Sequence, residues 1–355
     1  MTTATLIGCG RIGFILENDP LRNKPCTHFG GMKKNRIHLA GACDIDTKRL
    51  DHISRLADLS TDHLHTDYRK ALARPTDIVT VSTHTDTHAE IVTAAAESGC
   101  RVIICEKPIA HDVRAARRMI DACRANKVHL MINHERRFDP RYRTVKRLIE
   151  RGAIGEIVSI RGILPTHGFN GKSRASLGGG PLLHDGTHLL DIISFLAGKI
   201  VKVDGRFSRI GRSAGFEDHA WALLETETGI PAQISVGGGT KYFGFGVEVF
   251  GTTGKIEIGN GFNRLFRMTR SKYYKGFFDL TETAFPAYKG NCFSELYREA
   301  KHIAQHGGNT QSSGEDGLAA LEAIHAIYLS GSRRKEVSIP LQETINIKKI
   351  FALGE

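Results

Sequence analysis

The sequence predicts a two-domain α/β protein whose N-terminal domain is a doubly wound parallel sheet. Over the first 135 residues, short and nearly continuous apolar runs alternate with amphipathic stretches, a pattern typical of parallel strands covered by helices on both faces. From about residue 156 the apolar runs are longer and are joined by Gly-containing turns, which favours a largely antiparallel or mixed sheet. A length of 355 residues fits two domains, which we place at 1–135 and 136–355, with a C-terminal segment that could pack back on the first domain.

The expected elements follow from these runs. In the first domain the strands are TATLIG (3–8), IHLAGACD (37–44), DIVTVST (77–83), CRVIIC (100–105) and VHLMIN (128–133), and helices are expected at 88–98 and 113–125. In the second domain helices are expected within 138–157, 181–198, 291–307 and 314–331, with strands between 156 and 259 and a short one within 335–341.

Composition describes an ordinary soluble globular protein. Hydrophobic residues make up 41% and charged residues 25% of the chain. No apolar run approaches the roughly 18 residues that span a bilayer, and the N-terminus lacks the features of a signal peptide. Seven scattered cysteines without a C-x-x-C pair indicate free thiols in a reducing compartment. We therefore expect a cytoplasmic protein with no membrane partner.

The formal charge of +11 is the one unusual global property. It could indicate a nucleic acid partner, but the Lys and Arg residues are spread along the chain without a dense basic tract or interleaved aromatic residues. We therefore expect no nucleic acid partner, and interpret the charge as a basic surface or as a pocket for an anionic small molecule.

The stretch LIGCGRIG carries G-x-G-x-x-G directly after the first strand. In such a loop the first glycine permits a tight turn, the second lets the backbone approach a pyrophosphate, and the third allows close packing of strand and helix. A helix that begins there offers unpaired N–H groups to the phosphates. The loop therefore predicts dinucleotide binding through Gly8, Gly10, Arg11, Ile12 and Gly13.

Asp44 ends the second strand, where a carboxylate can accept hydrogen bonds from the ribose hydroxyls of the adenosine half. Such a carboxylate repels a 2′-phosphate, so NAD is favoured, while Lys48 and Arg49 nearby keep NADP open. Asp44 lies about thirty residues beyond Gly13, where roughly twenty is usual. The segment 17–30 is therefore interpreted as an insertion.

Further motifs follow in order along the chain: VSTHTDTHAEI (81–91), CEKPIA (105–110), NHERRFDP (133–140), GAIGEI (152–157) and GGGPLLHDGTHLLD (178–191). With them the sequence resembles the glucose-fructose oxidoreductase and inositol dehydrogenase family, Gfo/Idh/MocA, over nearly its whole length. The resemblance implies an N-terminal Rossmann domain and a C-terminal α/β domain with a large open, mostly antiparallel sheet. It also implies NAD- or NADP-dependent oxidation or reduction of CH–OH groups on sugars, inositols and nucleotide sugars.

The resemblance implies site roles as well. It makes Glu106 a ribose or nicotinamide-side contact, Lys107 an active-site lysine touching the reacting oxygen, and His188 the acid/base histidine, with Pro108 shaping the turn. Hydride transfer from an alcohol requires a base for the hydroxyl proton and a donor for the developing charge on oxygen, and Lys107 and His188 supply such groups. The sequence leaves open which of the two accepts the proton first.

One departure from the family pattern concerns the auxiliary acid. Four residues before His188, where many relatives carry an aspartate, this chain has His184, followed by Asp185. We expect His184 and Asp185 to contact substrate or to orient His188, with Asp185 as the candidate catalytic acid. The spacing of the two histidines also suits a metal, but no third ligand cluster is evident and nicotinamide chemistry needs none. No metal is expected.

Other residues after strands are candidates for the cofactor site. Thr83 and His84 should border the cofactor. His88 is either a pocket residue or a structural residue of the helix start, and the structural interpretation is preferred. Arg137 either contacts nicotinamide-side or substrate groups or forms a salt bridge.

Selectivity should come from the insertion at 17–30, from the loop at 164–180 and from the strand ends near Lys241 and Tyr242. His167 and Lys172 make the second loop polar and basic, which suits hydroxyl groups and an anionic substituent. We expect a polyhydroxylated substrate, with an anionic or nucleotide-linked derivative left open. A noncatalytic, NAD-responsive binding protein is the alternative. The open sheet predicts a homodimer or homotetramer, because its exposed face would otherwise leave apolar surface in water.

Overall fold

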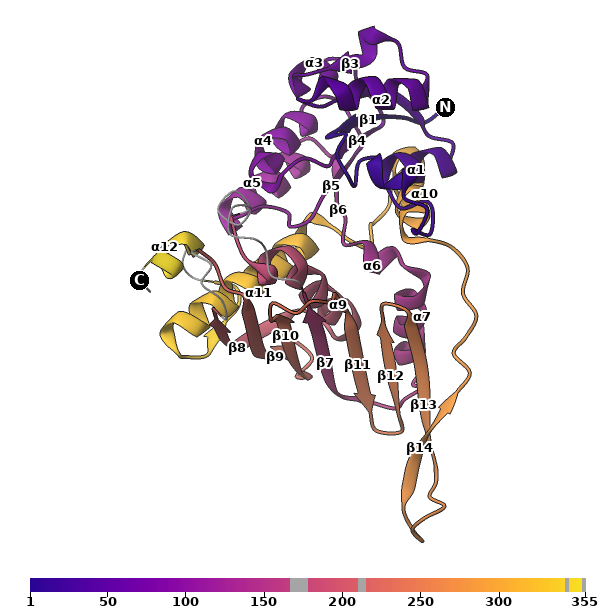
Figure 1. The fold of residues 1–355 in the computed structure, drawn as a ribbon, viewed down its shortest axis with the longest axis vertical. Coiled ribbons are helices and arrows are strands. Elements are labelled where there is room, and N and C mark those ends of the chain that lie inside the picture. Colours follow the sequence, from indigo (N-terminus) through magenta and orange to yellow (C-terminus); the bar gives the residue numbers. More distant parts are fainter. Residues whose placement is uncertain (167–177, 210–214, 342–344, 353–355) are drawn as a thin grey trace. The chain divides into compact units, whose positions relative to one another are not determined.

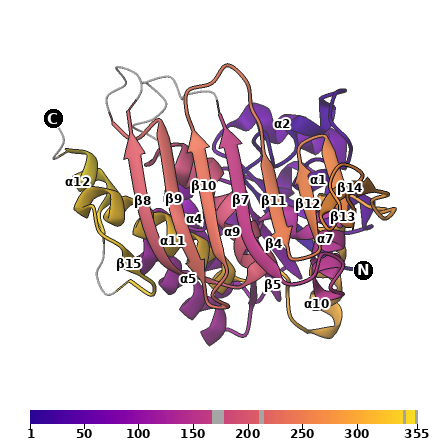
Figure 2. The same ribbon diagram turned by 90° about the horizontal axis from the view of Figure 1, so that it is seen from below.

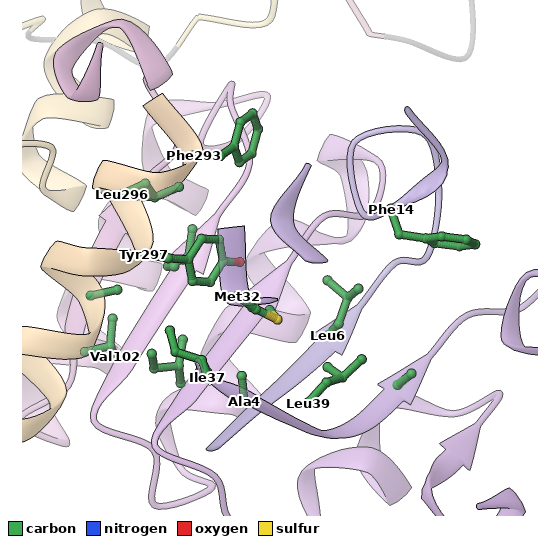
Figure 3. Close-up of a cluster of buried hydrophobic side chains, with 14 of the residues drawn as sticks. Ala4, Leu6, Phe14, Met32, Ile37, Leu39, Val102, Phe293, Leu296 and Tyr297 are labelled. Carbon is green, nitrogen blue, oxygen red and sulfur yellow. The ribbon is translucent and has the colours of Figure 1, made fainter. Parts of the chain in front are cut away.

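The computed structural model describes residues 1–166, 178–209, 215–341 and 345–352. The chain forms two compact units, one from Met1–Asp139 with Gly290–Leu318 and one from Pro140–Lys289 with Ala319–Glu355 (Figure 1). The helix expected at 291–307 thus belongs to the first unit. The reason is hydrophobic: Phe293, Leu296 and Tyr297 are buried in the core of that unit (Figure 3). Among the described residues, no helix has both the length and the apolar character needed to cross a membrane.

The first unit contains a parallel sheet, as predicted, and it has six strands because β3 adds one to the five that were expected. Its order is β3-β2-β1-β4-β5-β6. The strands are β1 (Thr3–Ile7), β2 (His38–Cys43), β3 (Leu64–His65), β4 (Ile78–Val81), β5 (Val102–Cys105) and β6 (His129–Ile132).

The register of these strands aligns their carboxyl ends. Ile7 pairs with Cys43 on one side and with Val81 on the other, Val81 pairs with Cys105, and Cys105 pairs with Ile132. The residues that follow the five strands therefore lie along one edge of the sheet, where ligands bind in doubly wound folds. They are Gly8, Asp44, Ser82, Glu106 and Asn133.

Several helices of the first unit begin at polar caps that satisfy some of their first N–H groups. Asp46, Asp67, Asp112 and Asn291 accept hydrogen bonds from the amides of the helices they precede. The helices are α1 (His28–Lys34), α2 (Thr47–Ala57), α3 (Tyr68–Leu72), α4 (Thr85–Ala96), α5 (Val113–Ala125), α6 (Glu135–Phe138) and α10 (Cys292–His306).

The glycine loop is not followed directly by a long helix, which corrects the sequence-based expectation. A helical turn after Gly10 leads only to a short 3-10 helix at Ile15–Asn18, and the regular helix α1 begins at His28. The amides of His28 and Phe29 donate to the carbonyls of Ile12 and Gly13 at 3.0 and 2.9 Å. Residues 14–27 are therefore looped out of the first helix, and Pro20 and Pro25 keep this segment from forming a helix interior.

The second unit contains a nine-stranded sheet in the order β14-β13-β12-β11-β7-β10-β9-β8-β15 (Figure 2). Only β7 and β10 are paired in parallel, so the predicted mostly antiparallel sheet is confirmed. The strands are β7 (Ile157–Pro165), β8 (Ile200–Ser208), β9 (His219–Thr226), β10 (Pro231–Gly237), β11 (Gly246–Gly251), β12 (Gly254–Gly259), β13 (Phe262–Arg270), β14 (Phe278–Thr283) and β15 (Val337–Ser338).

One face of this sheet is covered and the other is open. Buried and exposed residues alternate along β7, β9 and β10, as expected for a sheet with one solvated face. Leu189 of α9 lies against Gly162, and Ile327 of α11 lies against Gly205, where a Cβ would leave no room. The helices are α7 (Pro140–Glu150), α9 (Thr187–Ala197), α11 (Gly314–Arg333) and α12 (Ile347–Ala352).

We predict that Phe14→Ala destabilises the protein by about 3–5 kcal/mol, because Phe14 is fully buried in the core and packs edge-on against His52. The measurement is the free energy of unfolding in urea. Phe277→Ala removes the same side chain from a position that is 68% exposed and serves as the matched control. Equal losses in the two variants would contradict the placement of Phe14 in the core.

Candidate functional site

The glycine loop is shaped by close backbone contacts. Gly8 has φ +95°, and a Cβ there would lie 2.5 Å from the carbonyl carbon and oxygen of Ser82, so only glycine fits. The amide of Gly8 donates to Cys43 at 2.8 Å and its carbonyl accepts from the Ser82 hydroxyl at 2.6 Å. A Cβ on Gly13 would lie 2.4 Å from the carbonyl oxygen of Gly8. Both outer glycines are therefore required by the loop itself.

Gly10 differs, because a Cβ there would have only the Arg49 guanidinium nearby, at 3.7 Å. The open space above Gly10 is what a pyrophosphate needs in order to approach the backbone. The loop, which also holds Arg11 and Ile12, thus fits a dinucleotide.

Asp44 is a buried carboxylate that braces this loop. It accepts from the amide of Cys9 at 2.7 Å and from that of Asp46 at 2.9 Å. The guanidinium of Arg49 lies 3.5 Å from the Asp44 carboxylate and balances its charge. Burial, with the Asp44 charge beside it, raises the pKa of the Cys9 thiol far above its ordinary value, so this thiol stays protonated. Asp44 therefore lies buried after β2, with its carboxylate bound to two backbone amides and a cation next to it.

The residues after β4 are tied to the turn after β5. His88 is buried, with Nδ1 3.1 Å from the carbonyl oxygen of Pro108 and 3.3 Å from that of Ile109, and Nε2 3.2 Å from the carbonyl oxygen of Thr83. Burial lowers the pKa of His88. His84 occupies the N-cap position of α4 without a side-chain cap bond. The His88 ring thus connects the segment after β4 to the segment after β5.

The E-K-P turn begins with a buried carboxylate. Glu106 Oε1 lies 2.9 Å from Nε2 of His28 and accepts from Nδ2 of Asn133 at 2.5 Å. Oε2 accepts from the Lys107 amide at 3.3 Å, and the Lys107–Pro108 peptide is cis. Burial raises the pKa of Glu106, but the His28 hydrogen bond and charge, the Lys107 charge and the Asn133 hydrogen bond outweigh it, so the pKa lies below its ordinary value.

Lys107 is the only residue between Val102 and Ala110 that is not buried. It therefore presents its side chain at the carboxyl edge of the sheet, next to an ionised carboxylate. Arg137 is placed differently, since its guanidinium is buried, donates to the carbonyl of Gln311 at 2.8 Å and lies 3.0 Å from the Asp316 carboxylate. These contacts agree with the salt-bridge alternative for Arg137, in a buried setting.

Sequence reasoning missed His28 and Tyr297 as parts of this edge. His28 follows the looped-out segment, and Tyr297 lies far along the chain in α10, so no local motif connects either to Glu106. The one signal in the sequence that could have pointed to His28 is its position directly after Thr27, a residue type that favours a helix start and that caps α1.

In the second unit a π-helical turn leads into α9. The π turn covers Leu182–Gly186, and π turns inside helices are rare and frequent at functional sites. Within residues 179–193 only His184 and Asp185 are not buried, while His188 is 7% and Asp191 is 1% exposed. His184 and Asp185 are thus the accessible polar residues of this helix start.

The π turn is anchored by a buried carboxylate. Glu217 is fully buried, accepts from the Leu182 amide at 2.9 Å and from the Tyr328 hydroxyl at 2.9 Å. Burial and the Glu217 charge raise the pKa of Tyr328 well above its ordinary value, so the hydroxyl remains a donor. The predicted substrate residues His167 and Lys172 lie outside the described residues.

Over the parts of the chain that the structure describes, no group of three or more His, Cys, Asp or Glu side chains is placed to hold a metal ion. All seven cysteines are free thiols, and six of them are buried.

Comparison with known proteins agrees with this geometry. The family model described as "Oxidoreductase family, NAD-binding Rossmann fold" matches residues 3–134, and the "GFO/IDH/MocA C-terminal domain" matches residues 142–257. The protein is therefore an oxidoreductase with an NAD-binding Rossmann domain. The chain belongs to the Gfo/Idh/MocA family, as the sequence motifs predicted.

Named relatives cover most of the chain. A D-apiose dehydrogenase of Paraburkholderia graminis is 27% identical over 336 residues, 87% of this chain and 88% of that protein. An inositol 2-dehydrogenase of Rhizobium meliloti is 27% identical over 328 residues, 85% of this chain and 87% of that protein. An oxidoreductase from Agrobacterium radiobacter, solved in complex with NAD+, L-tartaric acid and magnesium, matches with a TM-score of 0.76 at 24% identity and covers 95% of this chain and 98% of that one.

We predict that Gly8→Ala and Gly10→Ala separate stability from cofactor binding. Gly8→Ala should lower both the melting temperature and NADH affinity, because its Cβ meets the Ser82 carbonyl. Gly10→Ala should leave the melting temperature nearly unchanged and weaken NADH binding at least tenfold, because its Cβ fills the space for the pyrophosphate. Thermal unfolding and fluorescence titration with NADH measure the two effects. Unchanged NADH affinity in Gly10→Ala would contradict the assigned binding site.

Proposed function

We propose that the protein transfers a hydride between NAD, or NADP, and a secondary hydroxyl or carbonyl carbon of a sugar, an inositol or a sugar derivative. The observation that carries the proposal is at the end of β5, where Lys107 alone is accessible within a buried turn and stands next to the ionised Glu106. The carboxyl edge of a doubly wound sheet is where such folds bind their ligands. Membership in a family of NAD-binding oxidoreductases supports the reaction class.

The cofactor supplies the hydride acceptor or donor when bound. The chain must move the hydroxyl proton and stabilise charge on the reacting oxygen. We propose that Lys107 donates a hydrogen bond to this oxygen and that His188 takes or returns its proton, since an imidazole changes charge near neutral pH. Asp185, accessible at the π turn, would orient His188 or serve as an auxiliary acid.

The substrate proposal rests on the relatives and on charge. Relatives named for D-apiose and for inositol support a polyhydroxylated substrate for this chain too. The formal charge of +11 leaves a carboxylate or phosphate on that substrate open. His167, Lys172 and His184 are proposed as substrate contacts, because their side chains pair with hydroxyl and anionic groups.

We predict that Lys107→Met and His188→Ala each lower kcat at least a hundredfold, because each removes a group that acts on the reacting oxygen. NADH affinity should change little, because neither side chain is needed to hold the cofactor. The assay follows NADH production with NAD or NADP across sugars, inositols and their acidic derivatives. Lys70→Met and His306→Ala, at exposed positions, are matched controls.

Near-normal turnover in either site variant would refute the role of that residue. NADH binding without turnover of any polyol would instead favour the alternative, a noncatalytic protein that responds to NAD.

We also propose a homodimer or homotetramer that associates through the open face of the second sheet. Trp221 and Leu223 of β9 and Ile163 of β7 are 42, 62 and 43% exposed there. They line a shallow hollow together with polar residues that include Arg161, Arg206 and Ser235. Exposed apolar area of this kind marks interaction surfaces. We expect Leu223→Glu to convert the oligomer to a monomer in light scattering, with Tyr273→Glu as an exposed control. An unchanged mass for Leu223→Glu would contradict this interface.

A further inference from the structure

The segment looped out of the first helix ends by placing a histidine on the E-K-P turn. We propose that His28, supported by Tyr297, is a positioning residue that keeps the Glu106 carboxylate oriented and ionised beside Lys107. This inference rests on the proposed function and on the role that the family resemblance implies for Glu106, a contact on the ribose or nicotinamide side of the cofactor. According to this inference, the pH range of cofactor binding depends on His28, a residue outside the catalytic motifs.

The geometry is a continuous chain of buried polar groups. His28 is fully buried, with Nε2 2.9 Å from Glu106 Oε1 and Nδ1 3.0 Å from the Tyr297 hydroxyl. That hydroxyl lies 2.8 Å from Oγ1 of Thr80 in β4. At the other end, Asn133 donates to the same Glu106 oxygen. The chain therefore joins α1, α10 and the ends of three neighbouring strands.

The hydrogen-bonding capacities of these groups determine which of their atoms carry a hydrogen. An ionised carboxylate only accepts, so Nε2 of His28 must carry a hydrogen toward Glu106. Nδ1 faces a hydroxyl that can either donate or accept by rotating. A neutral His28 accepts from Tyr297, and a charged His28 donates to it while Tyr297 turns its hydrogen to Thr80. The network is therefore satisfied in both charge states of His28.

Electrostatics makes Glu106 dependent on His28. The groups that face this carboxylate are His28 of α1, Lys107 of the same turn, the Cys105 thiol at the end of β5, His88 of α4, Asn133 after β6 and Tyr297 of α10. Burial opposes the ionised form, and the His28 hydrogen bond and charge are the largest opposing contributions. Without His28, less remains to counter the effect of burial, so the pKa of Glu106 rises. Glu106 then becomes protonated at a pH at which it is ionised in the unsubstituted protein.

The same residue connects the turn to the glycine loop. The amide of His28 donates to the carbonyl of Ile12 within G-x-G-x-x-G, while its ring contacts Glu106. The His28 ring packs edge-on against Phe293, with 5.4 Å between the ring centroids and an angle of 87° between the ring planes. This packing and the Thr27 cap of α1 restrict the orientation of His28. Glu17 closes the looped-out segment by accepting from the Thr27 hydroxyl at 2.7 Å and the Cys26 amide at 3.0 Å. His28 is therefore held at both its backbone and its ring.

The test compares His28→Leu, His28→Gln and Tyr297→Phe by NADH affinity between pH 5 and 9, which needs no substrate. We expect His28→Leu to lose at least tenfold in affinity at pH 6 and much less at pH 8.5, because its Glu106 is ionised only at higher pH. His28→Gln, which keeps an N–H donor, should restore most of the affinity, and Tyr297→Phe should give a smaller loss in the same direction. His38→Leu, at an exposed position, is the control.

The outcomes separate the two proposals. A loss in His28→Leu that is equal at all pH values indicates a merely structural role and overturns the inference. If His28→Leu does not fold, a pH profile of Tyr297→Phe that matches the unsubstituted protein overturns it as well. A pH-dependent loss of NADH affinity together with no turnover of any polyol upholds the inference while the proposed reaction fails.

Discussion

The first unit depends on one buried negative charge, the carboxylate of Glu106. A buried ion is costly unless hydrogen bonds and opposite charge compensate it. His28 and Asn133 supply hydrogen bonds to one oxygen, and the Lys107 amide supplies one to the other. These donors come from the first helix, from the end of β6 and from the turn itself. Compensating this single charge therefore requires strand ends and helices to adopt one arrangement, and that arrangement leaves Lys107 accessible.

The second unit solves a similar problem at the start of α9. Glu217 is fully buried and accepts from the Leu182 amide and the Tyr328 hydroxyl, so a carboxylate anchors the π turn. The wider π turn places His184 and Asp185 as accessible residues and leaves His188 buried one turn later. In each unit a buried acid thus lies next to accessible polar groups, and its hydrogen bonds fix the backbone that carries them.

Much of this architecture could be predicted from local patterns. Apolar runs of strand length, G-x-G-x-x-G after the first of them and the E-K-P and G-G-G motifs indicated the parallel sheet, the cofactor loop and the family. The helix start after Gly13 was predicted wrongly, because the hydrogen bonds that join Ile12 to His28 skip residues 14–27 and leave no periodic signal. Arg137 was expected either at the cofactor or in a salt bridge. Its guanidinium is buried against the Gln311 carbonyl and the Asp316 carboxylate, which are distant in sequence, so no local pattern could decide between the two.

The sequence by itself determined the strands, the glycine loop and the residue types available for chemistry, because backbone geometry and hydrophobic periodicity act over a few residues. Gly8 shows this, since a turn that needs positive φ calls for glycine in any context. Only the tertiary structure decided which groups surround Glu106. His28 and Tyr297 are separated by most of the chain, and their meeting at 3.0 Å reflects burial and hydrogen-bond satisfaction, which depend on packing in three dimensions.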